Sequence, residues 1–221
     1  MRAALTPEHR EFFSRNHFIE FEELLPFLDC EKIKEHTDQV LLKRTLKSLE
    51  SQSPEQLFAV GRDLFREDAL IRKMVVSRLL AQTFSLLLDA PVIRVAYDEV
   101  LRTTKIGSSP LSQATSLQSV SAFQSLLGGA VIRLTPDGTS HEFLPQKVGS
   151  VVFFRPDLPL PWPDFFQIEH QSFLLIAYAP ERCLYVPSSD DPHGHALKKL
   201  GYGSGDALNN TLHPIAFRRE L

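Results

Sequence analysis

The amino-acid sequence predicts an α+β fold in which a helical first part packs on one side of a β-sandwich or jelly roll. Two observations support this prediction. Apolar residues recur with helical spacing to about residue 90, and short β-branched or aromatic runs bounded by proline and glycine follow. Helices that precede a set of strands are typical of α+β architecture. We therefore expect one domain, 1–221, with a helical flank at 1–90 and a β core at 91–221.

The expected helices have recognisable starts. Thr6-Pro7-Glu8 offers a hydroxyl at the N-cap and a proline at the first helical position, and Ser53-Pro54-Glu55 repeats this arrangement. A further helix is expected over about 29–51, with Asp29 as its cap. The strongest helix is expected from Asp68 to Leu88, because its apolar residues have helical spacing and its second half is apolar nearly all round. A helix with that pattern is buried against a large surface.

The expected strands are five short apolar runs that turn residues separate. These runs lie at residues 91–97, 129–134, 150–154, 173–179 and 183–187. The stretch 106–125 is rich in Ser, Gln and Thr, so we expect it to form a loop or a weak polar strand.

Composition and charge exclude several classes of protein. The chain has 221 residues and a net charge of −3, so no strong positive field attracts nucleic acid or an anionic membrane. The N-terminus lacks the apolar segment of a signal peptide, and charged residues interrupt the apolar stretch 70–93, so we expect no membrane span. Cys30 and Cys183 are too few and too far apart for a disulfide framework. We therefore expect a cytoplasmic protein.

Four segments resemble phytanoyl-CoA dioxygenase-like proteins, which are non-heme iron(II), 2-oxoglutarate-dependent oxygenases. "LTPEHREFFSRNHFIEFEELLPF" (5–27) is similar to their N-terminal helix and first strand, and "LLLDAPVIRVAYDEVLRTT" (86–104) to a helix that leads into a strand. "GSVVFFRPDLPLPW" (149–162) is similar to their late core strand, and "DDPHGHALKKLGYGSGDAL" (190–208) to the tail of bacterial members. The resemblance implies a double-stranded β-helix, a cupin-like jelly roll, with the N-terminal helices on one side.

The resemblance also implies an iron site made of two histidines and one carboxylate, with open positions for 2-oxoglutarate and dioxygen. This sequence departs from that pattern. The best match places Leu117 and Ser119 on the His-x-acid motif and Leu160 on the second histidine, and no His, Asp or Glu occurs between 105 and 134. The His-x-acid sequences that do occur begin at His9 and His36, in predicted helices where residues two apart do not converge.

The residue that would bind the far carboxylate of 2-oxoglutarate is missing as well. Arginine and lysine are absent between Arg155 and Arg182, and His170 and Ser172 stand near the expected position. Arg94 and Tyr97 are expected to line what is left of the pocket. We therefore expect an oxygenase-like scaffold that binds neither iron nor 2-oxoglutarate.

The leading functional hypothesis is thus a pseudoenzyme with a binding or regulatory role. Its partner would be an unidentified small molecule or protein, and neither nucleic acid nor a membrane is expected. A further possibility is a protein-interaction module that uses the helical flank, for example as a homodimer.

A metalloprotein with relocated ligands is the alternative. His193-Gly194-His195 follows Asp190-Asp191, and an extended His-x-His can place both imidazoles on one side, with Asp191 completing a metal site. In that case iron and 2-oxoglutarate could still be used. Pro192 and Gly194 instead favour a solvated surface turn.

Overall fold

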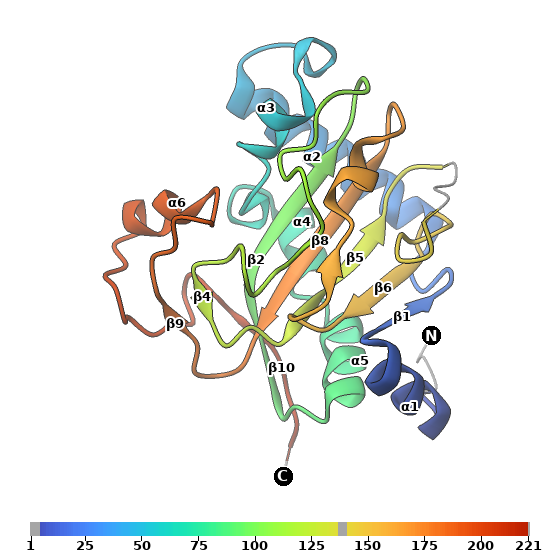
Figure 1. Cartoon of the computed structure of the whole chain (residues 1–221), viewed down its shortest axis with the longest axis vertical. Helices are drawn as coiled ribbons and strands as arrows, with labels where there is room; N and C mark the ends of the chain where they lie inside the picture. Colours follow the sequence, from blue (N-terminus) through green and yellow to red (C-terminus); the bar gives the residue numbers. More distant parts are fainter. Residues whose placement is uncertain (1–4, 137–140, 221) are drawn as a thin grey trace.

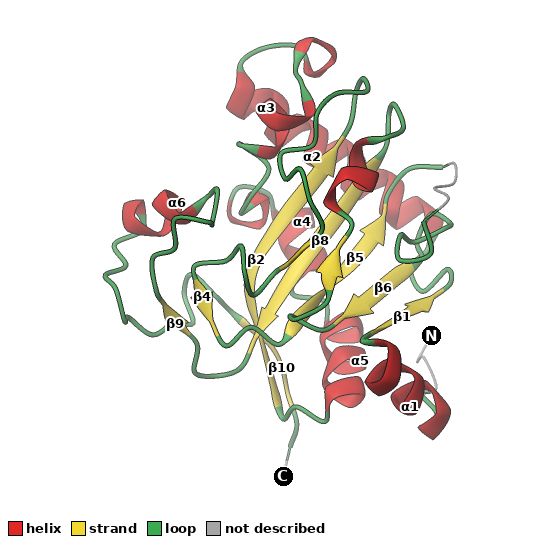
Figure 2. Cartoon of the chain, in the orientation of Figure 1, coloured by secondary structure: helices red, strands yellow, loops and turns green. Residues whose placement is uncertain are grey.

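A six-stranded antiparallel sheet forms the centre of the computed structural model, which describes residues 5–136 and 141–220. Its strand order is β1 (Phe18–Phe21), β6 (Val151–Phe154), β5 (Gly128–Arg133), β8 (Ser172–Ala179), β2 (Val92–Arg102) and β10 (Ile215–Arg218). Helices cover one face of this sheet, and loops with two small sheets cover the other (Figure 1). The mixture of helices and antiparallel strands agrees with the predicted fold class (Figure 2).

All five predicted apolar runs contain a strand. The small sheets pair β3 (Thr115–Ser116) with β7 (Pro159–Leu160), and β4 (Phe123–Gln124) with β9 (Leu184–Tyr185). The polar stretch 106–125 thus forms two very short strands between loops, as its composition predicts.

The helices that start at Pro7 and Pro54 begin at the predicted caps, Thr6 and Ser53. The helix expected over 29–51 instead covers Phe27–Thr45, so the prediction of Asp29 as its cap is wrong, and Asp29 lies in the first turn. The helices are α1 (Pro7–Asn16), α2 (Phe27–Thr45), α3 (Pro54–Phe58), α4 (Ala69–Val75), α5 (Arg78–Leu88) and α6 (Gly194–Lys199), with 3-10 turns η1 (Leu49–Ser51), η2 (Leu64–Arg66) and η3 (Trp162–Phe166). The Asp68 carboxylate accepts hydrogen bonds from two amides of α4, and the Ser53 hydroxyl accepts one from Gln56 in α3. Within the described residues, no helix combines the length and apolar character that a membrane span requires.

The single helix predicted over 68–88 is wrong. The chain leaves the helical conformation at Ser77, where φ is −56° and ψ is 120°. The two resulting helices have different neighbours, since α4 packs against α2, whereas α5 packs against β2 and β10. One straight helix could not cover both surfaces, so the break lets Ile71 of α4 and Phe84 of α5 each reach the core.

Two apolar cores lie on opposite faces of the large sheet, because side chains alternate along each strand. Leu174 and Ile176 of β8 belong to the core under the helices, whereas Phe173 and Leu175 belong to the core under the small sheets. We call this second core the sheet interior. Its larger members include Phe58, Tyr97, Leu101, Leu117, Phe123, Val131, Val152, Phe154, Leu160, Trp162, Phe165, Phe173, Leu175 and Tyr185.

Candidate functional site

The sheet interior contains two of the three positions that were expected to stand in for iron ligands. Leu160 lies in β7 opposite Thr115 of β3, and Leu117 follows β3 directly, so both leucines are buried in the interior. Ser119 differs from the expectation, because it is exposed and its hydroxyl lies 2.9 Å from that of Ser116 within a turn. Ser119 therefore lies outside the interior that contains the two leucines.

Aromatic rings fill the space around these leucines. The rings of Phe165 and Phe173 meet edge to face with centroids 5.3 Å apart, and Trp162 lies 6.0 Å from Phe165. The indole of Trp162 donates a hydrogen bond of 2.9 Å to the Thr115 carbonyl, so its only polar atom is satisfied. Within 5–136 and 141–220, no three His, Cys, Asp or Glu side chains are grouped so as to hold a metal ion.

The expected anchor positions for 2-oxoglutarate lie at one end of β8. His170 is exposed in a turn, with φ of 59°, and its carbonyl accepts a hydrogen bond of 3.1 Å from Arg102. It lines an open hollow of about 640 Å³ to which Arg102 also contributes. Ser172 is buried at the start of β8, where its amide donates to the Thr135 hydroxyl. His170 is therefore a surface residue rather than part of the interior.

Arg94 and Tyr97 have separate roles on β2. Arg94 donates to the carbonyls of Glu181 and His213, at 3.2 and 2.6 Å, so it holds two later segments of the chain against β2. Tyr97 is buried in the interior, where its ring stacks on Phe123 at 5.5 Å and lies 4.1 Å from the guanidinium carbon of Arg62. Burial raises the pKa of the Tyr97 phenol, so the group stays neutral.

Beside the interior lies a cluster of charged side chains that we call the buried ionic network: Arg62, Glu99, Asp191 and His193. Arg62 Nε donates to Glu99 Oε2 at 2.7 Å, and its Nη1 donates to Asp191 Oδ1 at 2.8 Å. His193 Nε2 lies 3.4 Å from the same Glu99 oxygen. At most 9% of any of these side chains is exposed. Such burial of four ionisable groups is uncommon and marks the region as a candidate site.

Close backbone pairing brings Arg62 to Glu99. The Val100 amide donates to the Gly61 carbonyl at 2.8 Å, and Arg62 forms a bridge with Glu99 on β2. A Cβ atom on Gly61 would lie 2.7 Å from the Val100 carbonyl oxygen, so glycine is the residue that permits this approach. The sequence carries this signal only as an isolated glycine after α3.

Asp191 joins three segments of the chain. Its Oδ2 accepts from the Ala122 amide and its Oδ1 from the His193 amide, both at 2.8 Å, in addition to the bond from Arg62. The prediction of a solvated turn is therefore wrong for these residues, since Asp191 is 6% exposed and His193 is 5% exposed. Both are held between β2 and the loop that precedes β4.

The arrangement does not fit the alternative of a relocated metal site. Both oxygens of Asp191 already accept hydrogen bonds from N–H groups, and the Arg62 cation occupies the place that a metal would need. The backbone turns into α6 at Gly194, so His195 lies on a helix and the extended His-x-His pattern does not form. The side chains of the buried ionic network can hold a proton and can bind anions.

Burial determines which carboxyl groups of this region are protonated. Burial raises the pKa of Glu99 to about 8, even though Arg62 opposes the shift. The neighbouring Asp98 points to the helical side of β2, and burial together with the Asp63 carboxylate raises its pKa to about 7. Glu99 therefore keeps its proton near neutral pH, although it lies beside the Arg62 guanidinium.

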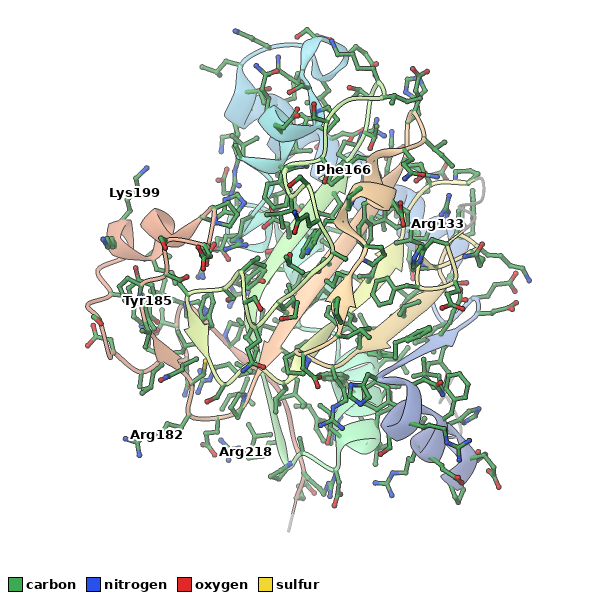
Figure 3. All side chains as sticks on the ribbon, viewed as in Figure 1. Arg133, Phe166, Arg182, Tyr185, Lys199 and Arg218 are labelled. Atoms are coloured by element: carbon green, nitrogen blue, oxygen red, sulfur yellow. The ribbon has the colours of Figure 1, made fainter. Side chains whose placement is uncertain are left out.

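A hollow of about 400 Å³ opens beside the buried ionic network, and we call it the arginine hollow. Its lining residues are Arg44, Ala59, Val60, Arg62, Asp63, Arg66, Glu67, His193, Lys199 and Leu200. Lys199 extends from α6 at the edge of the molecule (Figure 3). Sequence reasoning missed this hollow because its arginines lie in segments with no motif.

Comparison with known proteins gives a likeness of fold. No model of a known protein family and no curated protein matches the chain. The solved structure of SnoK, a non-heme α-ketoglutarate-dependent carbocyclase from nogalamycin biosynthesis, matches with a TM-score of 0.69 and 14% identity over 96% of both chains. The α-ketoglutarate-dependent epimerase SnoN of the same biosynthesis matches with a TM-score of 0.65 and 14% identity over 95% of this chain and 98% of SnoN.

HygX from Streptomyces hygroscopicus, solved with nickel and 2-oxoglutarate, matches with a TM-score of 0.56 and 12% identity over 93% of this chain and 98% of HygX. At such low identity the likeness concerns the fold alone. The fold thus resembles that of non-heme, 2-oxoglutarate-dependent oxygenases, which agrees with the predicted fold class.

Proposed function

We propose that this chain is a non-catalytic binding or regulatory protein on an oxygenase-like jelly roll, a degenerate relative of the phytanoyl-CoA dioxygenase-like proteins. One observation carries the proposal: the sheet interior is filled with buried apolar side chains, and Leu117 and Leu160 stand where the resemblance places metal ligands. A leucine side chain has no lone pair to offer iron. If the fold is a jelly roll, the small sheets β3-β7 and β4-β9 form its second side.

The residues present do not fit iron and 2-oxoglutarate in the interior. A facial metal site needs three donor side chains and room for the cosubstrate. The rings of Trp162, Phe165 and Phe173 occupy the space beside Leu160. Moving one such ring into water would cost about 1.5–3 kcal/mol, so the interior is a stable core rather than a closed pocket. We therefore derive no catalytic step through a metal.

Metal loading tests this proposal directly. The purified chain would be incubated anaerobically with iron(II) and 2-oxoglutarate and then desalted, and the bound iron would be measured by mass spectrometry. We expect well under one iron per chain and no release of succinate after oxygen is admitted. One tightly bound iron per chain together with turnover of 2-oxoglutarate would contradict the proposal.

The same experiment separates the alternative with relocated ligands. If iron binds and the variant His193→Ala loses it, the metal uses the region of the buried ionic network. The matched control is His141→Ala, which removes a half-exposed histidine far from that network in sequence. Iron lost equally from both variants would indicate non-specific binding to histidines and would leave the proposed function standing.

A further inference from the structure

We propose that the arginine hollow binds a small organic phosphate. The inference rests on the proposed function as a binding protein, and it supplies the location and chemical class of the ligand. It concerns a surface hollow outside the sheet interior. Four segments of the chain surround this hollow: the end of α2, the loop after α3, the turn η2, and α6.

Two arginines of the hollow keep a donor nitrogen that the described residues leave unused. Arg62 uses Nε and Nη1 for Glu99 and Asp191, and its Nη2 makes no hydrogen bond with them. Arg66 donates from Nη1 to the Leu212 carbonyl and holds Nε 3.3 Å from Asp63, whereas its Nη2 is buried and has no hydrogen-bond partner within the described ranges. Planar guanidinium groups with unused donors are the side chains best suited to phosphate oxygens.

Arg44 serves as the contrast. Its Nη1 donates to the carbonyls of Val60 and Arg62, both at 2.6 Å, and its Nε donates to Glu67 at 2.9 Å. Its Nη2 donates to the Asp63 carbonyl at 3.2 Å. Every nitrogen of Arg44 is therefore engaged, so this residue supports the wall of the hollow and is not a candidate ligand contact.

Lys199 adds a third free donor at the rim. It is exposed, and within the described part of the chain its ammonium group forms no ion pair. Figure 3 shows its side chain extending from α6 into open space. A lysine on a flexible stem can fold over a bound anion as a point charge.

The charges of the hollow leave an excess of cations. Glu67 pairs with Arg44 at 2.8 Å and with Lys43 at 3.4 Å, and Asp63 pairs with Arg66. The remaining cation that lines the hollow without a carboxylate of its own is Lys199. Behind Arg62, Glu99 keeps its proton near neutral pH because burial raises its pKa. An anion that enters the hollow therefore meets a positive surface.

The shape of the hollow favours a phosphate group that is attached to a small organic molecule. Donors that approach from three segments match the tetrahedral oxygens of a phosphate, whereas a planar carboxylate is matched by one guanidinium. The hollow of about 400 Å³ is also larger than a phosphate group needs. Ala59, Val60 and Leu200 give it an apolar wall against which a carbon skeleton can pack.

Calorimetry at low salt tests the inference, with inorganic phosphate, glycerol 3-phosphate and acetate as the probes. We expect saturable binding of both phosphates, with glycerol 3-phosphate bound more tightly, and acetate bound about tenfold more weakly. Lys199→Gln should weaken glycerol 3-phosphate binding about fivefold to tenfold. Arg66→Lys, which keeps the charge but loses the planar fork, should weaken it by a similar factor.

Lys198→Gln is the matched control, because it removes the same charge from the next residue of α6 without touching the hollow. It should change the affinity less than about twofold, as expected for a screened charge. The inference is overturned if neither phosphate binds saturably, or if Lys198→Gln weakens binding as much as Lys199→Gln. Thermal unfolding of each variant checks that the fold persists.

The outcome also separates this inference from the proposed function. A chain that binds glycerol 3-phosphate through Lys199 and also turns over 2-oxoglutarate keeps the inference and loses the proposed function. A chain that binds neither iron nor phosphate keeps the proposed function and loses the inference.

Discussion

The sheet interior and the buried ionic network are neighbours on one strand, yet they hold the fold together by different means. Tyr97 and Leu101 of β2 belong to the interior, and Glu99 lies between them on the same face and belongs to the network. Apolar packing is non-directional, so loss of one side chain weakens it by the contacts of that side chain. A buried charge depends on a particular partner, so loss of one member leaves the others uncompensated.

The largest effect is expected for Arg62→Met. This change leaves Glu99 and Asp191 buried without the cation that both contact at 2.7–2.8 Å. We expect the free energy of unfolding to fall by about 3–5 kcal/mol, as for other broken buried ion pairs. Chemical denaturation at pH 7 measures the change.

The paired variant Arg62→Met with Asp191→Asn is the control for that prediction. Removing the carboxylate that is ion-paired with Arg62 together with the cation should recover part of the lost stability, because no buried charge is then left without its partner. If Arg62→Met alone costs less than about 1 kcal/mol, the network is solvated and the contrast with the interior fails.

A smaller loss is expected for Leu160→Ala in the interior. Leu160 has no exposed surface, so truncation removes packed methyl groups and leaves a cavity. We expect a loss of about 3 kcal/mol in the free energy of unfolding. Leu42→Ala is the control, since Leu42 is 48% exposed on α2 and its truncation should cost no more than about 0.5 kcal/mol. Equal losses for the two variants would show that Leu160 is not part of a packed core.

The third prediction is a dependence of stability on pH, which over any one pH unit is smaller than either loss above. The pKa of Glu99 rises from an ordinary 4.5 to about 8 in the fold, so between these values the folded state holds a proton that the unfolded state has released. The free energy of unfolding should therefore fall as the pH rises from 5 to 8, by at most about 1.4 kcal/mol per pH unit from this group.

Glu99→Gln should flatten that part of the pH profile, because glutamine does not titrate. Asp98, whose pKa rises to about 7, should leave a weaker slope of the same sign below pH 7. Denaturation curves of both proteins at pH 5, 6, 7 and 8 test this. An unchanged slope in Glu99→Gln would mean that Glu99 is ionised in the fold and that its proton lies elsewhere.

Much of the fold could be predicted from the sequence because local signals encode it. Thr6-Pro7 and Ser53-Pro54 mark helix starts, and the β-branched runs at 91–97 and 173–179 mark central strands. Helix capping and apolar periodicity act between residues a few positions apart, so both can be recognised in the sequence. The break between α4 and α5 was missed, because both halves carry the same apolar spacing and only their separate packing partners divide them.

The candidate site was less predictable. The sequence shows leucines at 117 and 160, where the resemblance places metal ligands, and the structure buries both leucines in one core. The exposure of Ser119 and the burial of Asp191 cannot be read from the sequence. Turn composition predicts the backbone conformation, but it does not predict which other segments pack over the turn.

The sequence by itself determined where helices and strands form, which faces of the strands are apolar, and that histidines are missing where the resemblance expects them. Only the tertiary structure decided that Arg62 pairs with Glu99, 37 residues away, and with Asp191, 129 residues away. The physical reason is that apolar burial follows from a repeating local pattern, whereas a buried charge is stable only if a distant partner arrives at hydrogen-bond distance. The arginine hollow depends on that same long-range pairing.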